Sequence, residues 1–268
     1  MTFPARLHVL IAPQARSGVV IRRGPSEQVC FVGWDMARDR FTLGQWLKGR
    51  IYPQRSDLSP DGKHVIYFAA KGVAWTAISR APYLKAIGLW KQSHRWNGGG
   101  LFVSSNRYWL NESFDMEAVQ TPDELVMINE PADPETCAAI GECPGIYLPR
   151  LLRDGWRETG QQERRSGEHV TRLEKPARNG WTLRKIFHAT SAERAPGRGC
   201  YWEEHELRNE DVVIAQPDWE WAEVDGRRLV WAERGVLYEG RVSAQGLDAV
   251  KALHDFNAMS FEPIAAPY

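Results

Sequence analysis

The stretch of this chain best suited to bind a ligand is His94-Arg95-Trp96-Asn97-Gly98-Gly99-Gly100. Three glycines allow a close backbone approach and expose amide donors, while Arg95 offers a fork of donors and Trp96 an aromatic platform. The spacing of a phosphate-binding loop, G-x-x-x-x-G-K-[ST] or G-x-G-x-x-G, is absent. We therefore consider Arg95, Trp96 and Asn97 candidate binding residues. The alternative is a tight connection between two strands.

Signatures of catalysis do not stand out elsewhere in the sequence. The run Tyr201-Trp202-Glu203-Glu204-His205-Glu206 lacks the H-E-x-x-H spacing that places two imidazoles on one helical face. A G-x-S-x-G elbow is absent too, and carboxylate pairs such as Glu203 and Glu204 are too common here to indicate glycosidase chemistry. The sequence thus predicts no catalytic residue, no metal and no cofactor.

The four cysteines are Cys30, Cys137, Cys143 and Cys200. They form no C-x-x-C pair, and none has a histidine at zinc-finger spacing. We expect reduced thiols, as in a cytoplasmic protein, with a small loop closed by Cys137 and Cys143 as the alternative.

Charge is segregated along the chain, although 34 Lys and Arg balance 34 Asp and Glu. Residues 36–107 hold twelve basic side chains and three Asp, whereas residues 111–142 hold nine acidic side chains and no Lys or Arg. The pattern repeats with eleven basic and six acidic residues in 151–199, then nine acidic and one basic in 201–225. A zero net charge makes nucleic acid an unfavoured partner.

The acidic block 111–142 supports one functional hypothesis. It would dock a protein with a basic surface, because clustered charge sets the rate and specificity of association. Asp115, Glu117 and Glu124 are the candidate contact residues. Alternatively, the block is only a solvated surface.

Aromatic residues are abundant, with 12 Trp in 268 residues. Most of these lie in apolar runs and are expected in the core. Trp219 and Trp221 alternate with charged residues in Asp218-Trp219-Glu220-Trp221, so one of these rings could be exposed to a sugar or a protein. Trp219 is included among the candidate binding residues.

Turn dipeptides mark the chain at fairly regular intervals and indicate β-hairpins. They are Ser17-Gly18, Asp61-Gly62, Ser105-Asn106, Asp154-Gly155, Asn179-Gly180 and Asp225-Gly226. Their second residues are 44, 44, 49, 25 and 46 positions apart. A period in the forties is about the length of one four-stranded propeller blade.

One module occurs twice in this series. Residues 61–75 and 225–238 each contain an Asp-Gly turn, a basic residue, an apolar strand, a basic-Gly step and a second apolar strand. Short β-branched and aromatic strands joined by tight turns are typical of stacked antiparallel sheets. We predict equivalent strand pairs in two blades.

The turn Ser59-Pro60-Asp61-Gly62-Lys63, followed by Val65-Ile66-Tyr67, resembles the S-P-D-G-K turn of WD40-like repeats in bacterial TolB-type propellers. That resemblance implies a β-propeller, here of about five or six antiparallel blades. The strings 75–80 and 96–102 also resemble a bacterial family, and this resemblance implies no activity.

Elsewhere the pattern predicts one short C-terminal helix over 246–256, where Leu247, Val250 and Leu253 recur at three-residue intervals. Residues 259–267 are expected to form an extended strand that covers the first blade. Residues 131–147 and 159–169 are expected to be loops.

The whole chain, 1–268, is expected to be a single propeller domain. Its N-terminal apolar run is too short for a secretory signal, and no stretch is long and apolar enough to cross a membrane, so a cytoplasmic location is expected. The favoured hypothesis is a non-enzymatic propeller that binds another protein, for example as a bacterial immunity or regulatory factor. The alternative is a hydrolase or lyase acting on a small or glycan substrate in the propeller funnel.

Overall fold

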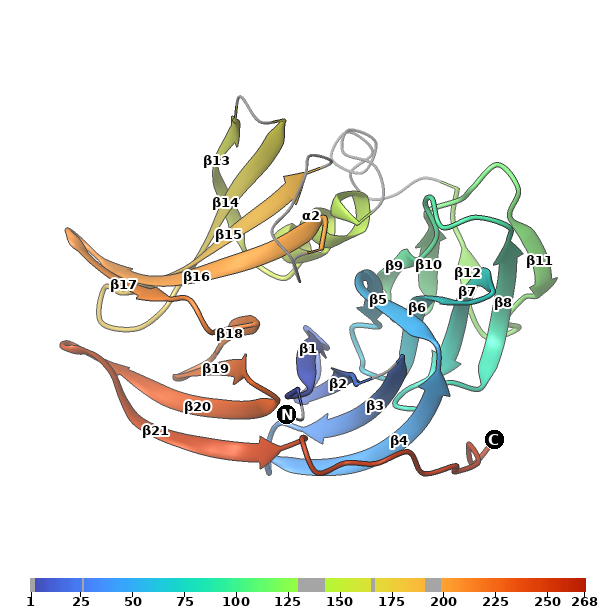
Figure 1. The fold of residues 1–268 in the computed structure, drawn as a ribbon, viewed down its shortest axis with the longest axis horizontal. Coiled ribbons are helices and arrows are strands. Elements are labelled where there is room, and N and C mark those ends of the chain that lie inside the picture. Colours follow the sequence, from blue (N-terminus) through green and yellow to red (C-terminus); the bar gives the residue numbers. More distant parts are fainter. Residues whose placement is uncertain (1–2, 26, 130–142, 165–166, 191–198) are drawn as a thin grey trace. The chain divides into compact units, whose positions relative to one another are not determined.

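The computed structural model shows an all-β protein with one described helix (Figure 1). The residues that it describes are 3–25, 27–129, 143–164, 167–190 and 199–268. Their strands form five small sheets of three to five strands each. The chain divides into two compact units: unit 1 comprises Met1–Arg150 and Ala258–Tyr268, and unit 2 comprises Leu151–Asn257. The all-β prediction is confirmed, and the single domain over 1–268 stays a prediction.

The first sheet of unit 1 is an antiparallel meander in chain order. Its strands are β1 (Arg6–Ile11), β2 (Ser17–Arg23), β3 (Gln28–Asp35) and β4 (Arg40–Lys48). Strands β2 and β3 are buried along most of their length, which suits their runs of Val, Ile and Phe. The outer strand β4 bulges opposite Phe31, where its register against β3 shifts.

Residues 86–127 pass back and forth between the second and third sheets of unit 1. The second sheet consists of β5 (Arg50–Leu58), β6 (His64–Lys71), β7 (Val73–Arg80), β8 (Ala86–Gln92) and β11 (Glu117–Gln120). The third consists of β9 (Gly100–Ser104), β10 (Arg107–Leu110) and β12 (Val126–Met127), with β12 parallel to β10. Strand β5 contacts β1 of the first sheet and β9 of the third.

One core of unit 1 lies between the first two sheets, and a second, which includes Ile66 and Phe102, lies between the second and third sheets. Phe31 of β3 meets Tyr67 of β6 edge to face, with ring centroids 5.6 Å apart. Ile21, Val65 and Leu58 belong to the same buried cluster. Strand β6 is buried from His64 to Ala70, so it reads as a continuous apolar run rather than an alternating one.

Unit 2 contains the other two sheets, both antiparallel and in chain order. The fourth sheet consists of β13 (Arg157–Glu163), β14 (Glu168–Pro176), β15 (Thr182–Thr190), β16 (Tyr201–Asn209) and β17 (Val212–Gln216). The fifth consists of β18 (Trp221–Asp225), β19 (Arg228–Glu233), β20 (Val236–Ser243) and β21 (Gly246–Asp255).

The duplicated module forms strand pairs in both copies, as the sequence predicts. The turn at Asp61-Gly62 leads into β6 and β7, and the turn at Asp225-Gly226 joins β18 to β19 and is followed by β20. Both pairs are antiparallel. Two other turn marks were misassigned, because Ser17-Gly18 lies at the start of β2 and Asp154-Gly155 follows the helix.

The helix predicted over 246–256 is wrong, because these residues form the outer strand β21. Two register shifts and a positive φ at Ala249 make this strand irregular, so exposure does not alternate along it. The helix is central instead: α2 spans Pro144–Arg153 and begins within the stretch 131–147 that was predicted to be a loop. Proline suits the first turn of a helix, where its missing N–H has no partner to lose.

Two further loop and strand predictions need correction. The polar stretch 159–169 includes most of β13 and the start of β14, an edge hairpin that needs no apolar face because β13 is almost wholly exposed. Residues 259–267 form no strand. Instead of pairing with a strand, the backbone of these residues accepts hydrogen bonds from side chains of unit 1.

Candidate functional site

The loop that contains Arg95, Trp96 and Asn97 joins β8 to β9 and packs against the segment that follows β10. Asn111 exchanges backbone hydrogen bonds with this loop, since Gly98 N donates to Asn111 O at 2.8 Å and Asn111 N donates to Gly99 O at 3.0 Å. The Asn97 side chain donates to Glu112 O at 2.9 Å. Predicted residues from two sequence regions, Asn97 and the start of the acidic block, are therefore neighbours.

Buried Arg55 of β5 binds the loop from the side that faces the core. Its Nη1 donates to Arg95 O at 2.7 Å and to Asn97 O, and its guanidinium lies 4.9 Å from the ring centroid of Phe68. The glycines fit this close packing: a Cβ at Gly98, which has φ of 78°, would lie 2.4 Å from Phe68. Their close approach is thus to the protein's own core.

Asp115 is the centre of the hydrogen bonds that join the two segments. It accepts from Ser93 N at 2.8 Å, from Ser93 Oγ at 2.5 Å and from Ser113 Oγ at 2.8 Å. These bonds, first of all the one from the Ser93 side chain, lower the pKa of Asp115 to about 2. The Asp115 side chain is only 21% exposed. Its carboxylate therefore stabilises the fold rather than presenting a charge to a partner.

His94, Ser113 and Asp115 have the residue types of a hydrolase triad, yet their geometry differs. His94 Nε2 lies 3.1 Å from both Ser113 Oγ and Asp115 Oδ1. His94 Nδ1 accepts the N–H of Trp96 at 3.1 Å, so the ring proton sits on Nε2. A protonated Nε2 cannot accept the serine proton, and a triad needs its carboxylate on Nδ1. His94, Ser113 and Asp115 therefore join the loop to the segment after β10, and we call these three residues the clamp. They do not form a nucleophile and its base.

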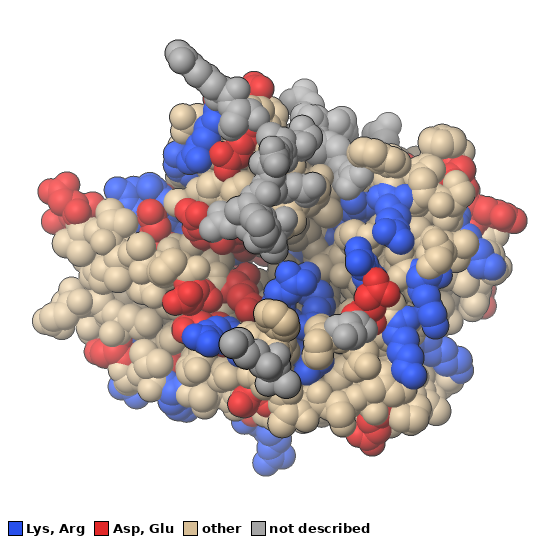
Figure 2. All heavy atoms as spheres, in the orientation of Figure 1, with Lys and Arg blue, Asp and Glu red and all other residues tan. Residues whose placement is uncertain are grey.

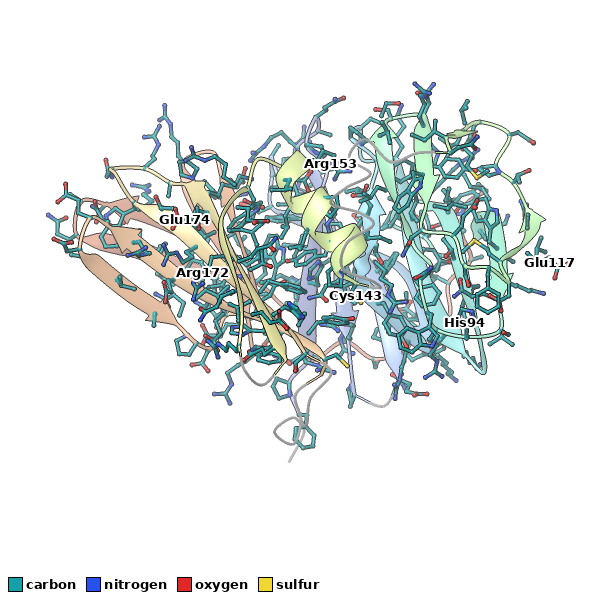
Figure 3. The ribbon with its side chains drawn as sticks, turned by 90° about the horizontal axis from the view of Figure 1, so that it is seen from above. His94, Glu117, Cys143, Arg153, Arg172 and Glu174 are labelled. Atoms are coloured by element: carbon teal, nitrogen blue, oxygen red, sulfur yellow. The ribbon has the colours of Figure 1, made fainter. Side chains whose placement is uncertain are left out.

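Two aromatic side chains stand out of this clamp. Trp96 is 67% exposed and Phe114 is 94% exposed. The Phe114 ring lies 4.9 Å from the His94 ring, and the Trp96 backbone is held by His94 Nδ1. We call Trp96, Phe114 and the ring of His94 the aromatic patch (His94 is labelled in Figure 3).

The remaining predicted residues lie apart from this patch. Glu117 is exposed on β11, and Figure 3 shows it at the outer edge of that strand. Glu124 binds Arg80 Nη2 at 2.8 Å and His64 Nε2 at 2.9 Å, and these hydrogen bonds lower its pKa. Trp219 is 4% exposed in unit 2 and stacks on Trp231, so it is a core residue. The expectation that Trp219 or Trp221 is exposed is not met, because burial of both rings stabilises the fifth sheet.

The acidic block is described only as far as residue 129. Its exposed acidic side chains are Glu112, Glu117 and Asp123, together with the partly exposed and ion-paired Glu124. Residues 130–142, Cys137 among them, lie outside the described residues, so pairing of Cys137 with Cys143 stays a prediction.

A buried ionic cluster in unit 2 was missed by the sequence analysis. Lys185 of β15 is 1% exposed and binds Glu203 Oε2 at 2.6 Å and His205 Nε2 at 3.1 Å, both on β16. The signal that could have found it is the period of two, because Lys185 lies two residues from both Leu183 and Phe187 and therefore shares their inner face of the strand. No group of three or more His, Cys, Asp or Glu among the described residues could hold a metal ion.

Comparison with known proteins adds no family: neither a family model nor a curated protein matches the sequence. In the part of the chain that the structure covers, no helix has the length and apolar character of a membrane span.

Proposed function

We propose that this protein is a non-enzymatic β-propeller of about five or six blades that binds another protein. Five sheets of three to five strands match the size of blades. Within unit 1 the first strands of three successive sheets, β1, β5 and β9, contact one another in chain order. First strands of neighbouring blades would be adjacent in this way around a propeller axis.

The observation that carries the binding proposal is the aromatic patch. Aromatic rings bury about 150–250 Å² each and are enriched among the residues that dominate interfaces. Trp96 and Phe114 leave most of that area in water, although each sits on a segment fixed by Arg55 or Asp115. A partner would therefore gain apolar contact while ordering little of this chain.

Charge gives the proposed partner its chemistry. Glu112 and Glu117 flank Phe114 in sequence, and both are exposed, as is Asp123. A partner with a basic surface would be attracted to these carboxylates, which act over about 8 Å at physiological salt. Such binding suits a regulatory or immunity protein in a bacterial cytoplasm. An enzyme is the less favoured function, because His94 is not placed as a base.

The first prediction tests the patch with a partner captured from the native host. Replacing Trp96 and Phe114 together by Ala should weaken its binding roughly tenfold to thirtyfold, because two exposed rings lose their interface contacts. The dissociation constant is measured by calorimetry on purified proteins. Val250→Ala in unit 2, where Val250 is 53% exposed, is the matched control and should leave binding unchanged.

The contribution of charge is separated by a second variant. Glu112, Glu117 and Asp123 are reversed to Lys, since reversal of Asp115 or Glu124 would break contacts that hold the fold. The association rate should then fall at low salt and approach the wild-type rate at high salt. Wild-type affinity in the Trp96 and Phe114 double variant would refute the proposed site.

A further inference from the structure

A second surface feature of unit 1 is an apolar pocket of about 250 Å³. Leu47 of β4, Tyr67 of β6, Trp75 of β7 and Leu89 of β8 line its walls, together with Leu84 of the loop between β7 and β8. All of these residues belong to unit 1.

The loop wall of the pocket is fixed before any ligand arrives. Tyr67 donates its hydroxyl hydrogen to Leu84 O at 2.7 Å, and Gln45 Oε1 accepts from Leu84 N at 2.8 Å. Ser79 Oγ donates to Tyr83 O at 2.6 Å in the same loop. Because these polar groups already have partners, the pocket offers an apolar interior that needs little rearrangement.

The single charged residue of the lining is Lys91, which is exposed on β8. The neighbouring Lys85 contacts Tyr268 O, so its ammonium is engaged. Glu117 is the cross-strand neighbour of Lys91, and the structure gives no ion pair between them within the described residues. Figure 2 shows Lys and Arg side chains gathered over the part of unit 1 that holds β5 to β8. Lys91 is thus the charged group of the lining that would attract an anion.

The volume limits the size of the occupant. A cavity of about 150 Å³ holds benzene, and pockets for larger organic ligands begin at about 300 Å³. A volume between these limits fits one aromatic ring with a short chain. The rings of Tyr67 and Trp75 offer it aromatic contacts, which prefer offset or edge-to-face geometry.

We propose that this pocket binds a small aryl carboxylate, with its ring between Tyr67 and Trp75 and its carboxylate beside the Lys91 ammonium. The inference does not rest on protein binding at the aromatic patch, because the purified chain alone should bind the ligand. A side chain of a partner protein as the natural occupant is the competing explanation, and it predicts no measurable affinity for the free acid.

The test uses 3-phenylpropionate as the probe and its uncharged alcohol, 3-phenylpropanol, as the matched ligand. A ligand of this size should bind with a dissociation constant on the order of a millimolar, measured by NMR chemical-shift titration. Shifts should be concentrated at Leu47, Leu84 and Leu89. The alcohol should bind roughly twofold to fivefold more weakly, because it lacks the charge that pairs with Lys91.

Variants of the chain test each part of the assignment. Lys91→Met should weaken binding of the acid roughly twofold to fivefold. Glu117→Gln should tighten it, because it removes the competing carboxylate. Lys63→Met is the control for Lys91→Met, since Lys63 pairs with Asp61 at 3.3 Å outside the pocket. Binding of the alcohol should be unchanged in all three.

Filling the pocket supplies the steric test. Ala86→Phe should abolish binding, while Val119→Phe on the exposed strand β11 should leave it unchanged. If Ala86→Phe fails to fold, Val73→Trp at the exposed rim serves instead. The proposal is overturned by no shifts at ten or so millimolar acid, by full binding to the filled pocket, or by equal affinities for acid and alcohol.

Discussion

At the scale of single residues, the buried ionic cluster of unit 2 shows how a charge is kept inside a sheet. Lys185 donates to Glu203 and His205, and its ammonium lies 5.2 Å from the ring centroid of Trp156. His205 Nδ1 donates to Trp219 O at 3.1 Å, so Nε2 has a free lone pair for the lysine. The imidazole is therefore neutral, and each of its nitrogens has a partner.

The second prediction concerns the pH dependence of stability. Burial, followed by the charge of Lys185, lowers the pKa of His205 from 6.5 to about 3. Between these two values the unfolded chain binds a proton that the folded chain does not. The free energy of unfolding should therefore fall as the pH drops below 6.5, by up to about 1.4 kcal/mol per pH unit from this group.

Urea unfolding at several pH values between about 7 and 5 measures this effect. His205→Gln keeps one donor and one acceptor but cannot take up the proton, so its stability should depend less on pH. His169→Gln removes an exposed histidine from strand β14 of the same sheet and should retain the wild-type dependence. An identical pH profile for wild type and His205→Gln would contradict the prediction.

At the scale of elements, the two copies of the module hold their turns by different means. Ser59 Oγ donates to Asp61 Oδ1 at 2.7 Å and accepts from Lys63 N at 3.1 Å and His64 N at 2.9 Å. In the second copy Asp225 accepts instead from Arg228 Nε at 2.8 Å. The serine therefore fixes the first turn from inside the core, where its side chain is fully buried.

The third prediction is that Ser59→Ala destabilises the protein by about 1–3 kcal/mol, because the buried backbone N–H of His64 loses its acceptor, whereas the N–H of Lys63 keeps Asp61 Oδ1 at 3.2 Å. Chemical denaturation gives the free energy of unfolding. Ser104→Ala removes the hydrogen bond to Asn106 from the partly exposed serine that ends β9, and it should cost less than about 0.5 kcal/mol. Equal free energies of unfolding for the two variants would contradict the prediction that the Ser59 hydroxyl stabilises the first turn.

The sequence predicts the hairpins well where a turn needs a particular residue. Gly62 and Gly226 have positive φ, and Asp-Gly steps mark such positions. Two outer strands, β13 and β21, could not be predicted in this way. Strand β13 is almost wholly exposed and polar, and β21 is exposed and bulged, so neither has the apolar alternation that identifies a strand.

The candidate site is predictable only in part for a similar reason. The adjacent glycines predict a binding segment at Arg95–Asn97, and Trp96 in that segment is exposed. Phe114 and the clamp around Asp115 were missed, because they depend on β9 and β10 folding back as a hairpin. Trp219 was misjudged since an Asp-Trp-Glu-Trp string does not show which sheet covers it.

At the scale of the whole molecule, Ala258–Tyr268 returns from unit 2 to join unit 1, and we call it the C-terminal strap. Arg22 Nη2 donates to Met259 O at 3.2 Å, and Gln45 Nε2 donates to Ile264 O at 2.8 Å. The Phe261 ring lies 6.0 Å from Trp46, and the Tyr268 hydroxyl donates to Lys85 O at 2.7 Å. Side chains of the first two sheets thus hold the strap.

The fourth prediction is that deleting the C-terminal strap lowers the melting temperature by several degrees. Each hydrogen bond contributes about 1 kcal/mol and each aromatic contact a similar amount, and the entropy cost of ordering an extended segment offsets part of this. A net loss of a few kcal/mol corresponds to about 2–4 °C per kcal/mol in a domain of this size. The deletion leaves Asn257 in place, because its side chain donates to Arg234 O within unit 2.

Thermal unfolding followed by circular dichroism measures this change, and Gln45→Ala tests whether the strap contacts cause it. Gln45 binds Ile264 O through one amide atom and the loop at Leu84 through the other. In the full-length chain Gln45→Ala should lower the melting temperature, whereas in the deletion variant it should cost less, because only the contacts to Leu84 and Lys85 remain to be lost. An unchanged melting temperature after deletion would mean that the strap lies on unit 1 without stabilising it, and strictly additive effects of the two changes would mean that the contact from Gln45 does not contribute to the stabilisation.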